Sequence, residues 1–221
     1  MAKPKEMKPR KDKAEARITE REAERGIYID FEGFEDRTPS ILGILIGEKL
    51  EQLVLDEKLA LGAAAKGLRV STLAECINSL MAVSKEEDRL IVAYSQHEKN
   101  VIREFAQIEM EGRYRDARMI AKRWMAKCRT DQPLSGRGLK DFLDFIGYPR
   151  GTHLGEKKTT SRLKAVAEML ERRGKLDTLT PVVKAKWTKL LEHNGIDCRG
   201  MRALVLLAAK ELNCESHAAT K

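Results

Sequence analysis

Residues 26–33 (GIYIDFEG) alternate apolar and polar side chains with a period of two. This alternation predicts a β-strand, and the β-branched and aromatic residues in it favour the same structure. Successive side chains of a strand point to opposite faces. The segment therefore predicts one face with apolar side chains and one face with two carboxylates. The apolar face has Ile27, Ile29 and Phe31, and the other face has Tyr28, Asp30 and Glu32.

The segments that follow predict a mixed sheet. Residues 40–49 (SILGILIGEK) and 50–58 (LEQLVLDEK) are typical of two further strands joined by a turn at Gly47, which predicts an antiparallel meander. Ser71 or Thr72 is expected to cap a helix that runs to about Ser84. The nearly all-apolar run 90–95 (LIVAYS) indicates a fourth strand in a central position.

The remainder of the chain has the apolar spacing of helices. We expect them near residues 97–109, 114–128, 138–146, 160–173, 181–193 and 198–213. The predicted fold class is α/β, with a three-strand antiparallel meander and a parallel strand flanked by helices, and a helical C-terminal half. The expected organisation is a charged tail over 1–25, one domain over 26–213 and a C-terminal tail over 214–221.

Charge and cysteine usage narrow the functional classes. The net charge of +8 suits a polyanionic partner, and residues 1–25 carry nine Lys/Arg and six Asp/Glu with few apolar side chains, so we expect that tail to be disordered or loosely helical. The four cysteines form no metal-finger spacing. No apolar run is long enough for a membrane span and no secretory signal is evident, so we expect a cytoplasmic protein with no membrane partner.

The two carboxylates of the first strand, Asp30 and Glu32, are the first candidate chemistry. Adjacent carboxylates repel one another, and burial of either one adds a further cost. A divalent cation such as Mg²⁺ or Mn²⁺ would offset both effects, since these ions take oxygen ligands. A solvated acidic face on an edge strand is the alternative that this segment leaves open.

Three other acids could converge on that strand. Glu98 follows the LIVAYS strand, but Ser95 and Glu98 also have the spacing of a helix capping box. Asp197 follows Gly195, which we expect to end one helix, so Asp197 could be the N-cap of the next helix or a metal ligand. Asp116 is a reserve candidate for which a structural role is favoured.

His193 lies four residues before Asp197 and is a candidate general base that would activate a water molecule. The nucleic-acid-binding candidates are Arg150, Lys157, Lys158 and Arg162, in a glycine-containing basic segment that could contact phosphates. A solvated basic face is the alternative explanation of that segment.

These motifs together resemble the DEDD exonucleases, which have an RNase H-like fold. More closely, the chain resembles the RNase H-like domains grouped with predicted RecB-type nucleases. The middle motif Y-x-x-x-E of that group is similar to residues 94–98 (YSQHE), and its last motif Y-N-x-x-D-C to residues 193–198 (HNGIDC). An Asp-led segment before an S-x-x-L-K helix that ends in Gly-Tyr is similar to residues 116–148.

The resemblance implies a nuclease that hydrolyses phosphodiester bonds in DNA or RNA, most simply a 3′–5′ exonuclease with two Mg²⁺ or Mn²⁺ ions. Its implied ligands are Asp30, Glu32, Glu98 and Asp197, with His193 as base. Two features depart from the usual pattern: Glu98 stands where many members have Asp, and His193 has the spacing of the tyrosine subclass. Partners would be nucleic acid and a larger nuclease or repair assembly.

Two other readings stay open from the sequence. The chain could be an inactive RNase H-like module that binds nucleic acid or a protein partner. It could also be a structural α/β domain whose acids are all caps and surface charges. Convergence of the four acids would separate the nuclease and the inactive module from the structural domain. Turnover would then separate the nuclease from the inactive module.

Overall fold

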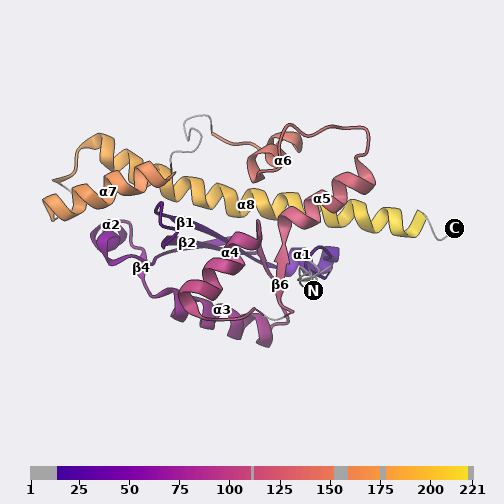
Figure 1. Cartoon of the computed structure of the whole chain (residues 1–221), viewed down its shortest axis with the longest axis horizontal. Helices are drawn as coiled ribbons and strands as arrows, with labels where there is room; N and C mark the ends of the chain where they lie inside the picture. The colour runs from indigo at the N-terminus through magenta and orange to yellow at the C-terminus, as the bar shows by residue number, and fades with distance from the viewer. Residues whose placement is uncertain (1–13, 111, 152–158, 175–177, 219–221) are drawn as a thin grey trace, which may run out of the picture.

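The computed structural model describes residues 14–110, 112–151, 159–174 and 178–218. A six-stranded mixed sheet forms the centre of the molecule (Figure 1). Its strands are β1 (Ile27–Gly33), β2 (Pro39–Ile46), β3 (Lys49–Val54), β4 (Arg69–Val70), β5 (Ile91–Ala93) and β6 (Tyr114–Asp116). The helices are α1 (Glu20–Arg25), α2 (Ala60–Ala64), α3 (Leu73–Glu86), α4 (Gln96–Val101), α5 (Ala117–Cys128), α6 (Leu139–Phe145), α7 (Thr159–Arg173) and α8 (Pro181–Ala218), with a 3₁₀ turn Glu57–Leu59 and a π-helical turn Ile102–Ala106.

The strand order is β4-β3-β2-β1-β5-β6, so β1 lies in the middle of the sheet. β1, β2 and β3 pair as an antiparallel meander, while β5 pairs with β1 and β6 with β5 in parallel. The predicted α/β class, the meander and the central fourth strand are therefore confirmed. Because β1 and β5 are parallel, their carboxyl ends lie at the same edge of the sheet.

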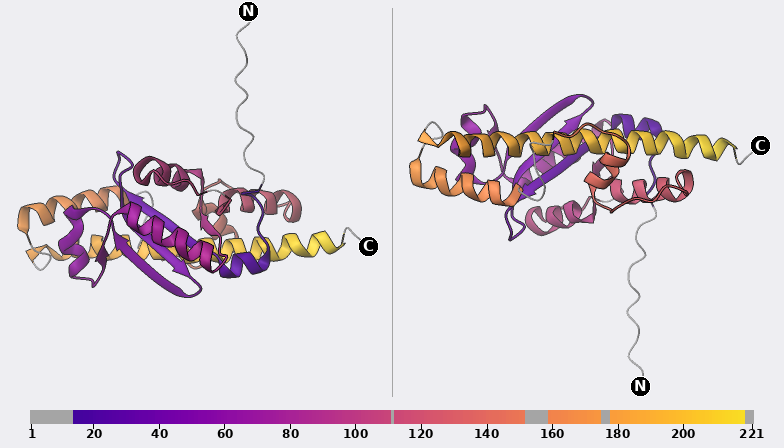
Figure 2. Two further views of the ribbon diagram at one scale, coloured as in Figure 1. Left: turned by 90° about the horizontal axis from the view of Figure 1, so that it is seen from below. Right: turned by 90° about the horizontal axis from the view of Figure 1, so that it is seen from above.

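Helices cover both faces of the sheet. α3 and α4 lie on one face and α8 crosses the other, and Figure 2 shows the two faces separately. Ile27 and Ile29 pack with residues of β5 and α3, whereas Tyr28 packs with Val92 and with Met201 of α8. The predicted alternation of β1 is thus confirmed, and it directs Asp30 and Glu32 toward the α8 side.

α8 is the largest departure from expectation, because residues 181–218 form one continuous helix. Two helices separated at Gly195 were predicted, and this prediction was wrong. A Cβ on Gly195 would lie 2.9 Å from Leu50, and one on Gly200 would lie 2.5 Å from Leu143. These glycines therefore allow close packing of α8 on β3 and α6 instead of ending a helix. The predicted C-terminal tail over 214–221 is helical to Ala218, and its last three residues lie outside the described ranges.

Two further predictions differ from the structure. Residues 114–116 form β6, a strand too short to show a period of two, instead of the first turn of a helix. Of the predicted tail over 1–25, residues 1–13 lie outside the described ranges, but α1 is capped by Thr19 and its Ala23 is buried in the core. Ile18 belongs to the same core cluster, so residues 14–25 form part of the domain. No helix in the described ranges is both long and apolar enough to cross a membrane.

Candidate metal centre

Asp30 is held by a buried amide that comes from α8. Asn194 is fully buried, and its Nδ2 donates to both the backbone carbonyl and Oδ2 of Asp30, at 3.0 Å each. Gln52 of β3 donates in turn to Asn194 Oδ1 at 2.9 Å and to the carbonyl of Leu191 at 2.7 Å. A Cβ on Gly43, which pairs with Asp30 across the sheet, would collide with the Asn194 side chain. The residues around Asp30 therefore fix the orientation of its carboxylate.

Asp197 lies one turn beyond His193 on α8. His193 Nδ1 is 3.8 Å from Asp197 Oδ2, and Arg150 lies 3.7 Å from Asp197 Oδ1. Neither distance is that of a hydrogen bond, and within the described residues Asp197 Oδ1 and His193 Nδ1 are buried with no hydrogen-bond partner. The prediction that Asp197 could cap a helix was wrong, since Asp197 lies in the interior of α8.

Glu98 has two roles at once. Its Oε2 accepts from the Ser95 amide at 2.9 Å and from the Ser95 hydroxyl at 3.1 Å, which completes a capping box at the start of α4. Glu98 is also buried, with 8% exposure, and its charge contributes to the raised pKa of Asp30. The capping role and the position beside the first strand are therefore compatible.

The charges of three of the predicted ligands act on the fourth, Asp30. Burial raises the pKa of Asp30 well above its ordinary value, and the charges of Asp197, Glu32 and Glu98 raise it further. Burial and Asp197 raise the pKa of Glu32 to about 8, against opposing contributions from Thr159 and Arg162. Acids on β1, α4 and α8 thus all act on the carboxylate of Asp30 and favour its neutral form.

The cations at this site come from two of the four predicted binding residues. Arg150 faces Asp197, and the buried Arg162 of α7 acts on both Glu32 and His193. Lys157 and Lys158 lie outside the described residues. Burial lowers the pKa of His193, and Arg150 and Arg162 lower it further against the opposing effect of Asp197. His193 is therefore neutral at physiological pH and able to accept a proton.

Asp116 is a structural residue. It is buried and caps α5 by accepting from the Met119 amide at 2.9 Å, and Gln96 donates to its other oxygen at 3.2 Å. Its partners account for both oxygens, so the favoured structural role of this reserve candidate agrees with its contacts.

The donor chemistry of the site fits a divalent cation. Four carboxylates supply hard oxygen ligands, and the buried Asp197 Oδ1 has no partner within the described residues. As placed, no three His, Cys, Asp or Glu side chains of those residues stand close enough together to hold an ion.

Sequence reasoning missed three of the residues that build this site: Gly43, Gln52 and Asn194. Asn194 stands next to a predicted base, but its burial depends on the continuity of α8. Gly43 lies within an apolar strand segment, and a glycine at such a position is a signal of close approach by another group. Comparisons of this chain with protein-family models, with curated proteins and with solved structures gave no match.

Proposed function

We propose that this protein is a metal-dependent nuclease that hydrolyses phosphodiester bonds, with Asp30, Glu32, Glu98 and Asp197 as ligands of two divalent cations. The observation that carries the proposal is the electrostatic effect of three of these acids on the fourth, Asp30. They come from segments as far apart as residues 30 and 197, yet Asp30 responds to all three others. Structural acids are normally compensated by donors, whereas acids left in mutual repulsion are typical of functional sites.

Residues of the chain would have three roles in this reaction: positioning of a ligand, acceptance of a proton and binding of a phosphate. Asn194 holds the carboxylate of Asp30 in one orientation, and Gln52 holds Asn194. His193 is neutral and would accept a proton from the attacking water, while Arg150 and Arg162 supply positive charge for a phosphate. Bound Mg²⁺ or Mn²⁺ would supply a more acidic water and charge neutralisation at the phosphate.

The topology supports the proposal that the fold is RNase H-like. An antiparallel meander followed by parallel strands on the far side of β1, with the acids at the carboxyl ends of β1 and β5, agrees with the resemblance described above. The same resemblance favours 3′–5′ exonuclease polarity.

The second candidate function is an inactive RNase H-like module that binds nucleic acid or a protein partner. Two observations favour it. Glu98 Oε2 accepts both of its hydrogen bonds from Ser95, the N-cap of its own helix. The carboxylates of the described residues are also not placed close enough together to hold an ion.

Turnover on end-labelled strands tests the proposal. Wild type and Asp30→Asn are each incubated with single- and double-stranded DNA and RNA, with Mn²⁺ and with EDTA. We expect the wild type to give a ladder of shortened strands with Mn²⁺ but not with EDTA, and Asp30→Asn to give none. The end from which the strands shorten gives the polarity. Binding without cleavage by the wild type would favour the inactive module, and neither binding nor cleavage would refute the nuclease and any nucleic-acid-binding role of the module.

A further inference from the structure

The strongest concentration of positive charge in the described residues lies away from the carboxylates, on and around α5. Residues 113–129 carry seven cations and one acid, the buried cap Asp116. The cations are Arg113, Arg115, Arg118, Lys122, Arg123, Lys127 and Arg129. We propose that α5 and its two flanking cavities bind the phosphate backbone of a nucleic-acid strand. This inference rests on the proposed nuclease function and adds a substrate-binding surface outside the metal centre.

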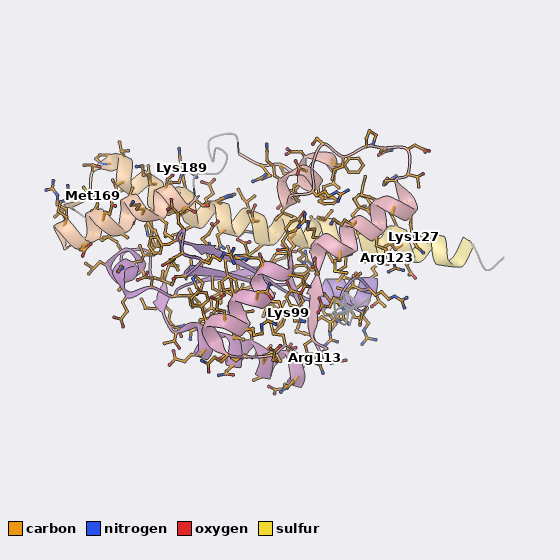
Figure 3. All side chains as sticks on the ribbon, viewed as in Figure 1. Lys99, Arg113, Arg123, Lys127, Met169 and Lys189 are labelled. Carbon is orange, nitrogen blue, oxygen red and sulfur yellow. The ribbon has the colours of Figure 1, made fainter. Side chains whose placement is uncertain are left out.

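α5 presents its charge on both sides of a single buried stripe. Its buried residues are Ala117, Ile120, Ala121 and Trp124, which pack against α8. The basic positions flank this stripe and are half-buried or exposed. Burial of one narrow face leaves the two sides of the helix open to a ligand, and Figure 3 labels Arg123 and Lys127 where α5 lies against α8.

A cavity lies on each side of α5, and cations line both. The first, of about 670 Å³, is lined by Lys122, Arg129 and Arg137 together with polar and apolar side chains, with no acid among its described lining residues. The second, of about 520 Å³, is lined by Arg17, Arg115 and Arg123, and Glu22 is the one acid among the described residues that line it. Cavities with several cations and few acids suit a ligand with several phosphates.

Most of these cations are not neutralised by the fold. Arg113 pairs with Asp88 and Arg129 with Glu211. Within the described part of the chain, four others form no ion pair with a carboxylate: Arg115, Arg118, Arg123 and Lys127. A cluster of like charges without counter-charges costs stability, and a polyanion would offset that cost.

Two hydrogen bonds connect the elements that carry this basic surface to β5 and α4, beside the candidate metal centre. Gln96, the first residue of α4, donates to Asp116 at the start of α5, and Glu98 lies two residues further along α4. The Tyr94 hydroxyl donates to the carbonyl of Arg137 at 2.8 Å, so the rim of the first cavity is attached to the end of β5. A strand with one end at the carboxylates could therefore follow α5.

The test measures binding without cleavage, in the Asp30→Asn background with EDTA. Arg123→Glu/Lys127→Glu reverses two charges on α5, and Arg172→Glu/Arg173→Glu reverses two exposed charges at the end of α7, a matched control at the opposite end of α8 (Figure 1). Fluorescence anisotropy with a labelled 20-nucleotide single strand and its duplex gives Kd at several salt concentrations. Equal thermal melting of both variants checks their folding.

We expect the α5 pair to raise Kd for the single strand by about tenfold or more and to make the salt slope shallower by about 1.4, since each lost phosphate contact on a single strand contributes about 0.7. The control pair should change Kd by less than about threefold. An unchanged Kd in the α5 pair, an equal loss in the control pair, or equally tight binding of poly-glutamate would overturn the proposal. The assay requires no turnover, so failure of the nuclease proposal would show separately, as absence of the ladder.

Discussion

Two groups of buried carboxylates lie at the same edge of the sheet, and they differ in how the fold compensates them. Glu15 and Asp116 have partners on every side: Lys99 lies 2.6 Å from Glu15, Gln96 donates to both acids, and the Met119 amide donates to Asp116. Figure 3 labels Lys99 beside this group. Burial and the charge of Glu15 raise the pKa of Asp116, whereas burial and the charges of three acids raise the pKa of Asp30.

The comparison teaches how to separate a structural acid from a functional one. Glu15 and Asp116 brace the N-terminal segment against β6 and α4, since the Asp116 amide also donates to the Glu15 carbonyl at 3.1 Å. Asp30 has a single side-chain donor, Asn194, against three acids. The fold therefore supplies the first group with an ion-paired lysine and several donors, whereas a cation would offset the charges around Asp30.

The largest expected effect is on the cleavage rate, and it distinguishes a substitution at Asp30 from one at Asp116. Asp30→Asn should lower the cleavage rate by about 10³-fold or more, because a ligand of the cations is lost. Its melting temperature without metal should stay the same or rise, as one repulsive charge is removed. Asp116→Ala should instead lower the free energy of unfolding by about 1 kcal/mol through loss of the α5 cap and retain the rate per folded molecule. A rate unchanged in Asp30→Asn would contradict the metal assignment.

The next effect concerns the amide that positions Asp30. Asn194→Ala should lower the cleavage rate by about 10- to 100-fold, as expected when a residue that orients a metal ligand is lost. Gly43→Ala should lower it similarly, because its methyl group would displace Asn194 from contact with Asp30. Ile77→Val in the opposite core serves as the control, since it should cost about 1 kcal/mol of stability with no loss of rate. Full activity in folded Gly43→Ala would show that Asn194 does not position Asp30.

The smallest effect is a pH dependence of stability without divalent metal. The pKa of Glu32 rises from 4.5 to about 8 on folding. A raised folded-state pKa contributes stability below the unfolded value, and this contribution is lost as the pH rises through the folded value. The free energy of unfolding should therefore fall by about 1 kcal/mol or more between pH 4.5 and 8. Urea titrations across this range measure it; Glu32→Gln and added Mn²⁺ should each flatten the slope, and a wild-type curve without slope would contradict the repulsion.

The sequence predicted the sheet well where periodicity and burial agree. β1 has alternating side chains over seven residues, and its two carboxylates lie where that alternation places them. β6 has three residues and no period, so only its pairing with β5 defines it. Gly195 was misread because a glycine signals a helix end and close packing equally well, and the difference depends on Leu50, which is 145 residues away in the sequence.

The candidate site was predicted in its acids but not in the groups that hold them. Asp30, Glu32, Glu98 and Asp197 were expected from the alternation of the first strand and from the family resemblance, and their role as ligands stays a prediction. Asn194 and Gln52 are ordinary polar residues until α8 lies on β3, and no local pattern reports that contact. Tertiary placement therefore supplies the part of the site that composition and spacing leave open.

α8 follows all six strands of the sheet in the sequence, and this order has a consequence for synthesis. The bond between Asn194 and Asp30 spans 164 residues, and the sheet is translated long before α8 is. Closure of so long a loop is slow, and during elongation the polar face of β1 has no covering helix. Under the proposed function, hydrolytic competence would therefore arise only when α8 docks, so a chain that lacks α8 would not cleave nucleic acid.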